Sequence, residues 1–227
     1  MSWDRRPAGG GGPQGGHGGG RRREFARRAD DPPGTSRLFV AIPVADEIRA
    51  EIRELMETVA GASIDERTHG QPRWVRVEGL HLTLRFLGAT PDERQPALVE
   101  AIAAAARGVA PFRVVLSGGG AFPDQYHPRV LWIGIDEGAD QLAALARSLG
   151  EHLVPLGWTR EDRALAPHLT LARTDGVPGA DERARRLIEV AEGISLGWQA
   201  DRIVLYKSIL GRGPSRYEVV AESPLSS

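Results

Sequence analysis

Hydrophobic residues along the chain follow two spacings, one typical of helices and one typical of strands. Leu142, Leu145, Leu149 and Leu153 recur every three or four residues and form the core-facing stripe of a helix. Elsewhere apolar and polar residues alternate at every second position, as in a strand with one buried face. In the first half of the chain these spacings predict a strand at 37–44, a helix at 46–60, a strand at 80–86, a helix at 91–106 and a strand at 112–117.

The second half repeats this order of elements. It predicts a strand at 129–136, a helix at 140–153, a strand at 164–173, a helix at 181–191 and a strand at 200–208. A last strand, at 216–221, has no counterpart. Repetition of a whole series of elements indicates an internal duplication. We therefore predict one bilobal domain over residues 36–227, with halves of about 36–120 and 121–227.

The phrase His-Leu-Thr-Leu occurs in the third element of each half. The first copy runs from His81 to Leu84 and the second from His168 to Leu171, 87 residues later. In a strand both Leu side chains point to one face, and the His and Thr side chains point to the other. If the two strands lie side by side about a pseudo-twofold axis, two imidazoles and two hydroxyls converge on one small volume.

Such a volume is suited to acid–base chemistry on an anion. Hydrolysis of a phosphodiester needs a base that takes a proton from water and an acid that protonates the leaving oxygen. An imidazole with an ordinary pKa of about 6.5 can serve either purpose. Hydroxyls such as those of Thr83 and Thr170 can stabilise charge that develops on the nonbridging oxygens. The repeated motif alone does not distinguish the acid from the base.

Composition narrows the classes of function. The chain has no cysteine, which excludes disulfides, thiolate catalysis and cysteine-based zinc sites. A metal site on His81 and His168 is disfavoured, because an HExxH or Asp-rich context is absent and threonine is a poor zinc ligand. We predict no metal and no cofactor. No apolar run approaches the roughly 18 residues that cross a bilayer, so we expect a cytoplasmic protein without membrane contact.

The first 35 residues differ from the rest. They contain a Gly-rich run at 9–20, and seven arginines against four acidic residues. A segment with so few apolar residues cannot offset its chain entropy by burial and is predicted to be disordered. Its positive charge favours weak, nonspecific contact with RNA, and a solvated extension without a role is an equally good interpretation.

Several phrases in the chain resemble those of a known superfamily, the 2H phosphoesterases. The resemblance covers residues 36–221 and is most marked for the RNA 2′,3′-cyclic phosphodiesterases of the LigT or ThpR type, once called 2′-5′ RNA ligases. It is carried by RLFVAI (37–42), WVR (74–76), HLTLRFLG (81–88), GAFP (120–123), RVLW (129–132) and PHLTLAR (167–173). The resemblance implies a bilobal α+β fold, in which two antiparallel-rich sheets flank a central cleft and the helices cover the outer faces.

The resemblance also implies an activity and the roles of the site residues. The expected reaction is metal-independent hydrolysis of RNA 2′,3′-cyclic phosphate ends to 2′-phosphomonoesters. His81 would be the proton donor to the ribose O3′, and His168 would be the proton acceptor that activates water. Thr83 and Thr170 would complete the catalytic set.

Two arginines and one aromatic residue are candidate substrate-binding residues. Arg85 is in phase with His81 and is predicted to share its face and to bind phosphate. Arg173 is out of phase in a flat strand, so it reaches the site only through twist, a bulge or the strand end, although the resemblance places an arginine there. Phe39 either stacks on a nucleobase or packs between sheet and helix.

Other functions use the same residues. RNA-end binding without hydrolysis, reversible 2′-5′ RNA ligation and hydrolysis of small cyclic nucleotides are the alternatives. The expected partners are therefore RNA with a 2′,3′-cyclic phosphate end or a small cyclic nucleotide. Because a duplicated chain supplies both motifs itself, we expect a monomer.

Overall fold

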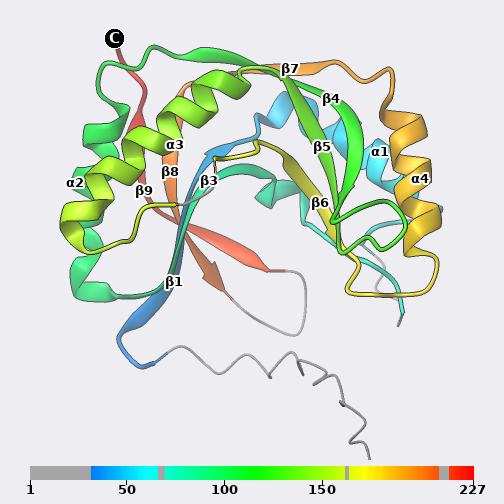
Figure 1. Ribbon diagram of the computed structural model, residues 1–227, viewed down its shortest axis with the longest axis horizontal. Coiled ribbons are helices and arrows are strands. Elements are labelled where there is room, and N and C mark those ends of the chain that lie inside the picture. Colours follow the sequence, from blue (N-terminus) through cyan, green and yellow to red (C-terminus); the bar gives the residue numbers. More distant parts are fainter. Residues whose placement is uncertain (1–31, 66–69, 162–163, 210–214) are drawn as a thin grey trace, which may run out of the picture. The chain divides into compact units, whose positions relative to one another are not determined.

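Nine strands of the described residues form two antiparallel sheets (Figure 1). The computed structural model describes residues 32–65, 70–161, 164–209 and 215–227, which belong to one compact unit, Asp31–Ser227. Sheet A has the order β3-β1-β8-β9, and sheet B has the order β2-β6-β5-β4-β7. Their bounds are β1 Thr35–Pro43, β2 Arg73–Trp74, β3 His81–Pro91, β4 Phe112–Phe122, β5 Val130–Glu137, β6 Leu169–Arg173, β7 Leu196–Ala200, β8 Arg202–Ile209 and β9 Arg216–Pro224.

Four α-helices and four short 3-10 turns connect the strands. They are η1 Asp46–Ile48, α1 Arg49–Ala60, η2 Val77–Gly79, η3 Asp92–Arg94, α2 Gln95–Ala106, α3 Ala139–Leu153, η4 Val154–Leu156 and α4 Ala180–Ala191, within the described residues. Helices α2 and α3 contact each other and sheet A, while α4 contacts sheet B and α1 (Figure 1). The predicted α+β class is confirmed, since helices cover antiparallel sheets.

The two sheets repeat one strand order, and each contains strands from both halves of the sequence. In sheet A, β3 and β1 are followed by β8 and β9; in sheet B, β6 and β5 are followed by β4 and β7. Each motif strand, β3 or β6, therefore lies beside the first strand of its own half of the sequence, β1 or β5. The strand beyond that one, β8 or β4, comes from the other half. This exchange makes each sheet depend on the whole chain.

The alternation of the motif strands separates a core face from a site face. Leu82 and Leu84 of β3, and Leu169 and Leu171 of β6, are buried in the hydrophobic core. The leucine stripe predicted in 140–153 is buried as well. Burial of a leucine side chain contributes about 1.5–3 kcal/mol, so these positions fix which face of each strand turns to the helices.

Some boundaries differ from the sequence prediction. Pro91, predicted to begin a helix, is the last residue of β3, because its ψ of 133° is extended and the helix starts only at Gln95. The strand predicted at 200–208 is divided between β7 and β8, which belong to different sheets. His168 lies just before β6. The predicted tail, residues 1–35, lies outside the described residues except for its last four.

Candidate functional site

The two motif strands belong to different sheets, and a short segment links β3 to β2, the strand that pairs with β6. β3 starts at His81 on the edge of sheet A, whereas β6 follows His168 in sheet B. Beside β6, the backbone N–H of Val75 donates to the Leu171 carbonyl at 2.8 Å, and β3 begins only six residues after Val75. This connection keeps β3 and β6 in contact, so both His-x-Thr motifs lie in one region.

The backbone holds both histidines in the same way. Nδ1 of His81 lies 2.7 Å from the carbonyl oxygen of Gly79, and Nδ1 of His168 lies 2.8 Å from that of Ala166. Because a carbonyl oxygen only accepts hydrogen bonds, Nδ1 carries the hydrogen in each neutral imidazole. Nε2 keeps its lone pair in both rings, and each ring can take up and return a proton at that atom.

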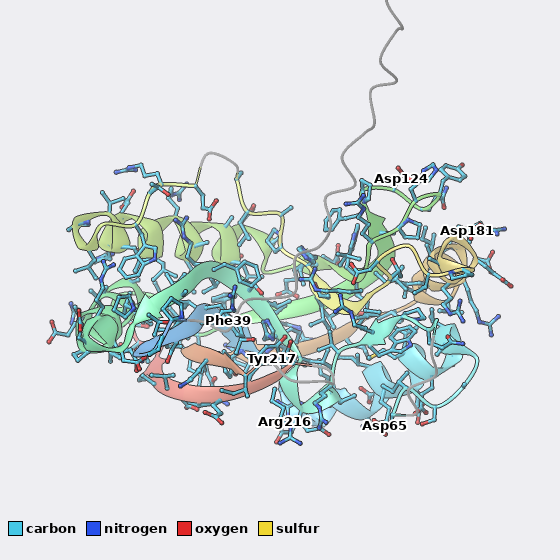
Figure 2. The ribbon with its side chains drawn as sticks, turned by 90° about the horizontal axis from the view of Figure 1, so that it is seen from below. Phe39, Asp65, Asp124, Asp181, Arg216 and Tyr217 are labelled. Atoms are coloured by element: carbon cyan, nitrogen blue, oxygen red, sulfur yellow. The ribbon has the colours of Figure 1, made fainter. Side chains whose placement is uncertain are left out.

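Three aromatic rings surround the imidazole of His81. The ring centroids of Phe39, Tyr217 and Tyr206 lie 4.7, 5.1 and 6.0 Å from that of His81. Figure 2 shows Phe39 and Tyr217 close together near the middle of the molecule. Burial lowers the pKa of His81 from 6.5 to about 4, and the bond to the Gly79 carbonyl opposes this shift only in part. The resting ring is therefore neutral at pH 7.

Gly79 allows Tyr217 to approach the peptide that holds His81. A Cβ atom at residue 79 would lie 2.9 Å from Cδ2 of Tyr217, which is closer than real Cβ contacts. The absence of a side chain at residue 79 therefore permits the packing of Tyr217 over this turn.

The surroundings of His168 are more open. Phe122 meets its ring edge-on at 5.0 Å, and Trp132 lies 6.3 Å away. The Phe122 side chain is itself 37% exposed, whereas the Phe39 side chain beside His81 is 3% exposed. The two imidazoles thus share backbone geometry and differ in their aromatic neighbours.

A bulge after Thr83 changes which residues of β3 share its face. Thr83 and Phe86 pair with Ala41 and Phe39, which lie two residues apart on β1. Because paired residues point to the same side of a sheet, and side chains alternate along β1, Thr83 and Phe86 share one face. Arg85 pairs with the residue between those two and lies on the opposite face.

The prediction that Arg85 shares the face of His81 and Thr83 is therefore wrong. Its side chain is only 7% exposed and forms an ion pair with Glu161, with 2.8 Å between Nη1 and Oε1. Nη2 also donates to the Thr159 carbonyl. The phase argument failed because it assumed a strand without bulges. Arg85 contacts the connection between α3 and β6, away from the hydroxyl of Thr83.

An equivalent bulge in β6 has the opposite consequence for Arg173. Thr170 and Arg173 pair with Trp132 and Val130, which lie two residues apart on β5. Arg173 therefore shares the face of Thr170, although it is five residues from His168. Its side chain is exposed, and its guanidinium has no ion-pair partner among the described residues. The bulge that the sequence argument required is present.

Phe39 is buried, as its packing interpretation predicts, but its neighbours are aromatic rings and not the helices. It lies on the His81 face, outside the core between sheet and helices, and yet it is covered by other rings. Phe86, with its ring centroid 6.1 Å from that of Phe39, is 65% exposed on the same face. Sequence reasoning missed Phe86, Tyr206 and Tyr217 as site residues. The sequence did offer one signal for Phe86, because this aromatic residue stands two positions after the first His-Leu-Thr-Leu phrase.

Two further observations concern the described residues as a whole. They contain no group of three or more His, Cys, Asp or Glu side chains that could hold a metal ion. No helix in this part of the chain combines the length and the apolar character needed to span a membrane.

Comparison with known proteins gives a family and several relatives. The family model described as the 2′-5′ RNA ligase superfamily matches residues 38–212. A Geobacillus stearothermophilus protein named RNA 2′,3′-cyclic phosphodiesterase is 35% identical over 191 residues, which cover 84% of this chain and 57% of that relative. A Thermotoga maritima protein of the same name is 30% identical over 186 residues, covering 82% of this chain and 94% of the relative.

Solved structures agree with the sequence comparison. A Thermus thermophilus protein has a TM-score of 0.65 and 29% identity, covering 83% of this chain and 97% of that chain. The Escherichia coli LigT crystallised with NADP+ has a TM-score of 0.62 and 26% identity, covering 85% and 99%. The family match spans most of the duplicated fold and includes both His-x-Thr motifs, so the chain belongs to the 2′-5′ RNA ligase superfamily.

Proposed function

We propose that this protein hydrolyses the 2′,3′-cyclic phosphate ends of RNA to 2′-phosphomonoesters without a metal ion. The observation that carries the proposal is the matched pair of imidazoles, each with Nδ1 bonded to a carbonyl two residues earlier and Nε2 left for proton transfer. Relatives named RNA 2′,3′-cyclic phosphodiesterase support the substrate class.

In the proposed reaction the two histidines act on opposite sides of phosphorus. Nε2 of His168 takes a proton from water, and the water oxygen forms a bond to phosphorus. The bond between phosphorus and O3′ breaks, and O3′ receives a proton from Nε2 of His81. The products are a 2′-phosphomonoester and a free 3′-hydroxyl. The acid and base roles follow the family resemblance.

Other side chains on the same face would stabilise the transition state. The hydroxyls of Thr83 and Thr170 can donate to nonbridging oxygens, and the exposed guanidinium of Arg173 can face their negative charge. Fixed donors of this kind stabilise developing charge more than they stabilise the substrate. Arg173 thus supplies the cation that we first expected from Arg85 as well.

Product analysis tests the proposal directly. A short RNA with a 2′,3′-cyclic end is incubated with the protein in EDTA, and the products are separated chromatographically. We expect a 2′-phosphate end at an undiminished rate. A 3′-phosphate end would contradict the proposed polarity, and an unchanged substrate would favour RNA-end binding. A parallel incubation with an RNA that has a 5′-hydroxyl end detects the reverse, ligating reaction.

The nucleobase is proposed to stack on Phe86 in place of Phe39. Stacking requires an open ring face, and Phe86 is 65% exposed whereas Phe39 is 3% exposed. Because stacking on an aromatic ring contributes about 1–3 kcal/mol, Phe86→Ala is expected to raise KM for a 2′,3′-cyclic nucleotide about 10-fold. Steady-state kinetics provide the measurement.

The control for this prediction is an equally exposed aromatic residue that, among the described residues, contacts neither histidine ring. Tyr126, 69% exposed in the loop between β4 and β5, is replaced in Tyr126→Ala, which is expected to leave KM unchanged. A cyclic phosphate without a base should show no effect of Phe86→Ala. An equal rise of KM for that substrate would exclude stacking as the role of Phe86.

A further inference from the structure

The connection between α3 and β6 is held against the strand that carries His81. Nε1 of Trp158 donates to the Leu87 carbonyl of β3 at 3.4 Å. The guanidinium carbon of Arg94 lies 4.0 Å from the centroid of the Trp158 ring, and Arg94 also donates to the Leu156 carbonyl. Residues 156–161 are therefore held against β3 and η3 by Trp158, which belongs to this connection, and by Arg94, which belongs to η3.

Arg85 is the most buried of the side chains that make these contacts, although its partner Glu161 is exposed. Its guanidinium, 7% exposed, binds the Glu161 carboxylate and the Thr159 carbonyl through its two terminal nitrogens. Its Nε is buried and has no partner among the described residues. A planar guanidinium holds two acceptors at a fixed spacing, which a lysine ammonium cannot reproduce. Arg85 therefore fixes both the position and the direction of this connection.

The contact between Arg85 and Glu161 links two parts of the chain that each lie close in sequence to one of the histidines. Arg85 is four residues from His81, and Glu161 is seven residues from His168. A second connection between the two motif strands runs through β2, which pairs with β6 and precedes β3 in the chain. Arg85 is thus a side chain that connects the His81 strand with residues 159–161, which precede His168 in the chain.

We propose that Arg85 is a positioning residue, which fixes residues 156–161 against β3 and thereby helps to set the separation of the two imidazoles. The proposal rests on the proposed function for its catalytic consequence. A displacement of reacting groups by about 1 Å can lower a rate about 100-fold. Loss of the contact therefore lowers kcat, while the phosphate site around Thr83, Thr170 and Arg173 stays intact.

Glu161 distinguishes this role from phosphate binding. If Arg85 bound the substrate, Glu161→Gln would free its guanidinium, and KM would stay constant or fall. If Arg85 fixes the connection, Glu161→Gln weakens it by removing the carboxylate charge at Nη1, and Arg85→Lys weakens it by removing the planar fork that holds both acceptors. Both variants are then expected to lower kcat about 10-fold or more, with KM for a small 2′,3′-cyclic nucleotide changed less than about 3-fold. The double variant is expected to be no slower than the slower single variant.

The experiment combines steady-state kinetics with amide hydrogen exchange on the full chain. Arg185→Gln, which removes an exposed arginine of α4, is the matched control and should change neither measurement. Exchange of the Trp158 amide, which donates to the Leu153 carbonyl, should accelerate in Arg85→Lys and in Glu161→Gln, whether or not the protein hydrolyses cyclic phosphates. Failure of wild-type turnover would therefore contradict the proposed function alone. Unchanged exchange, or a fully active Glu161→Gln with a raised KM in Arg85→Lys, would overturn the positioning role.

Discussion

Replacement of His81 or His168 by alanine is expected to lower kcat/KM for a 2′,3′-cyclic phosphate by about 10²–10⁴-fold, the usual contribution of general acid–base catalysis. Each ring offers Nε2 while its Nδ1 is bonded to a backbone carbonyl, so alanine removes the group that carries the proton at that position. The threonines can still bind phosphate. We therefore expect the loss mainly in kcat.

Matched variants separate this effect from damage to the fold. His152→Ala removes an exposed imidazole that also bonds a backbone carbonyl, that of Ser148, and should keep full activity. His81→Gln fills most of the volume among the surrounding rings and should be as inactive as His81→Ala. Near-ultraviolet circular dichroism checks the packing of those rings. Turnover within tenfold of wild type in either alanine variant would refute two-histidine catalysis.

A sulfur atom in place of O3′ would distinguish the acid from the base. A thiol has a pKa of about 8.5 and leaves without protonation far more readily than a ribose hydroxyl. The 3′-thio substrate should therefore restore much of the activity of His81→Ala and none of that of His168→Ala. Restoration in the His168 variant alone would exchange the two roles.

Local patterns were sufficient to predict most of the elements. The leucine stripe of α3 and the alternation in β3 depend on residues close in sequence; α3 formed where expected, and β3 starts within one residue of the predicted start but extends to Pro91. The pairing of β8 with β1, and of β4 with β5, depends on contacts between distant residues. A duplicated sequence is compatible with two separate halves or with exchanged strands, so the pattern alone could not predict the exchange.

In the candidate site, too, the residues set by the local pattern could be predicted, and those set by pairing with a distant strand could not. The repeated phrase pointed to the His and Thr side chains. In each strand these two residues come before the bulge, so simple alternation places them correctly. Beyond Thr83 and Thr170, one extra residue in each strand reverses the alternation. This reversal moves Arg85 off the site face and brings Phe86 and Arg173 onto it. A bulge is defined by the register with a neighbouring strand, which the motif strand alone does not encode.

Between pH 4 and the pKa that His81 has in the complex, binding of a phosphodiester anion is expected to weaken by up to about tenfold for each pH unit, with uptake of one proton by His81. The free ring has a pKa of about 4 because burial disfavours its charged form. An anion bound beside the ring favours the charged form and raises that pKa. Between the free and the bound pKa values, the complex holds one proton more than the free protein. Affinity therefore falls as pH rises, and becomes independent of His81 above the bound pKa.

Calorimetry with a non-hydrolysable 2′,3′-cyclic phosphodiester analogue measures this effect. Such a ligand keeps one negative charge across the range, so any proton uptake belongs to the protein. Titrations at pH 6 in two buffers of different ionisation enthalpy give the number of protons taken up. Comparison with His81→Gln isolates the contribution of His81 from those of all other groups, including His168.

The outcome bears on the chemical role of His81, because a proton donor must be charged in the complex. Near neutral pH the free ring is neutral, so a donor role requires that the substrate itself bring the ring to its charged form. Proton uptake that disappears in His81→Gln would support that sequence of events. Equal uptake in both proteins would mean that His81 stays neutral when the anion binds. Its Nε2 would then be suited to accept a proton from water, and the protonation of O3′ would fall to His168.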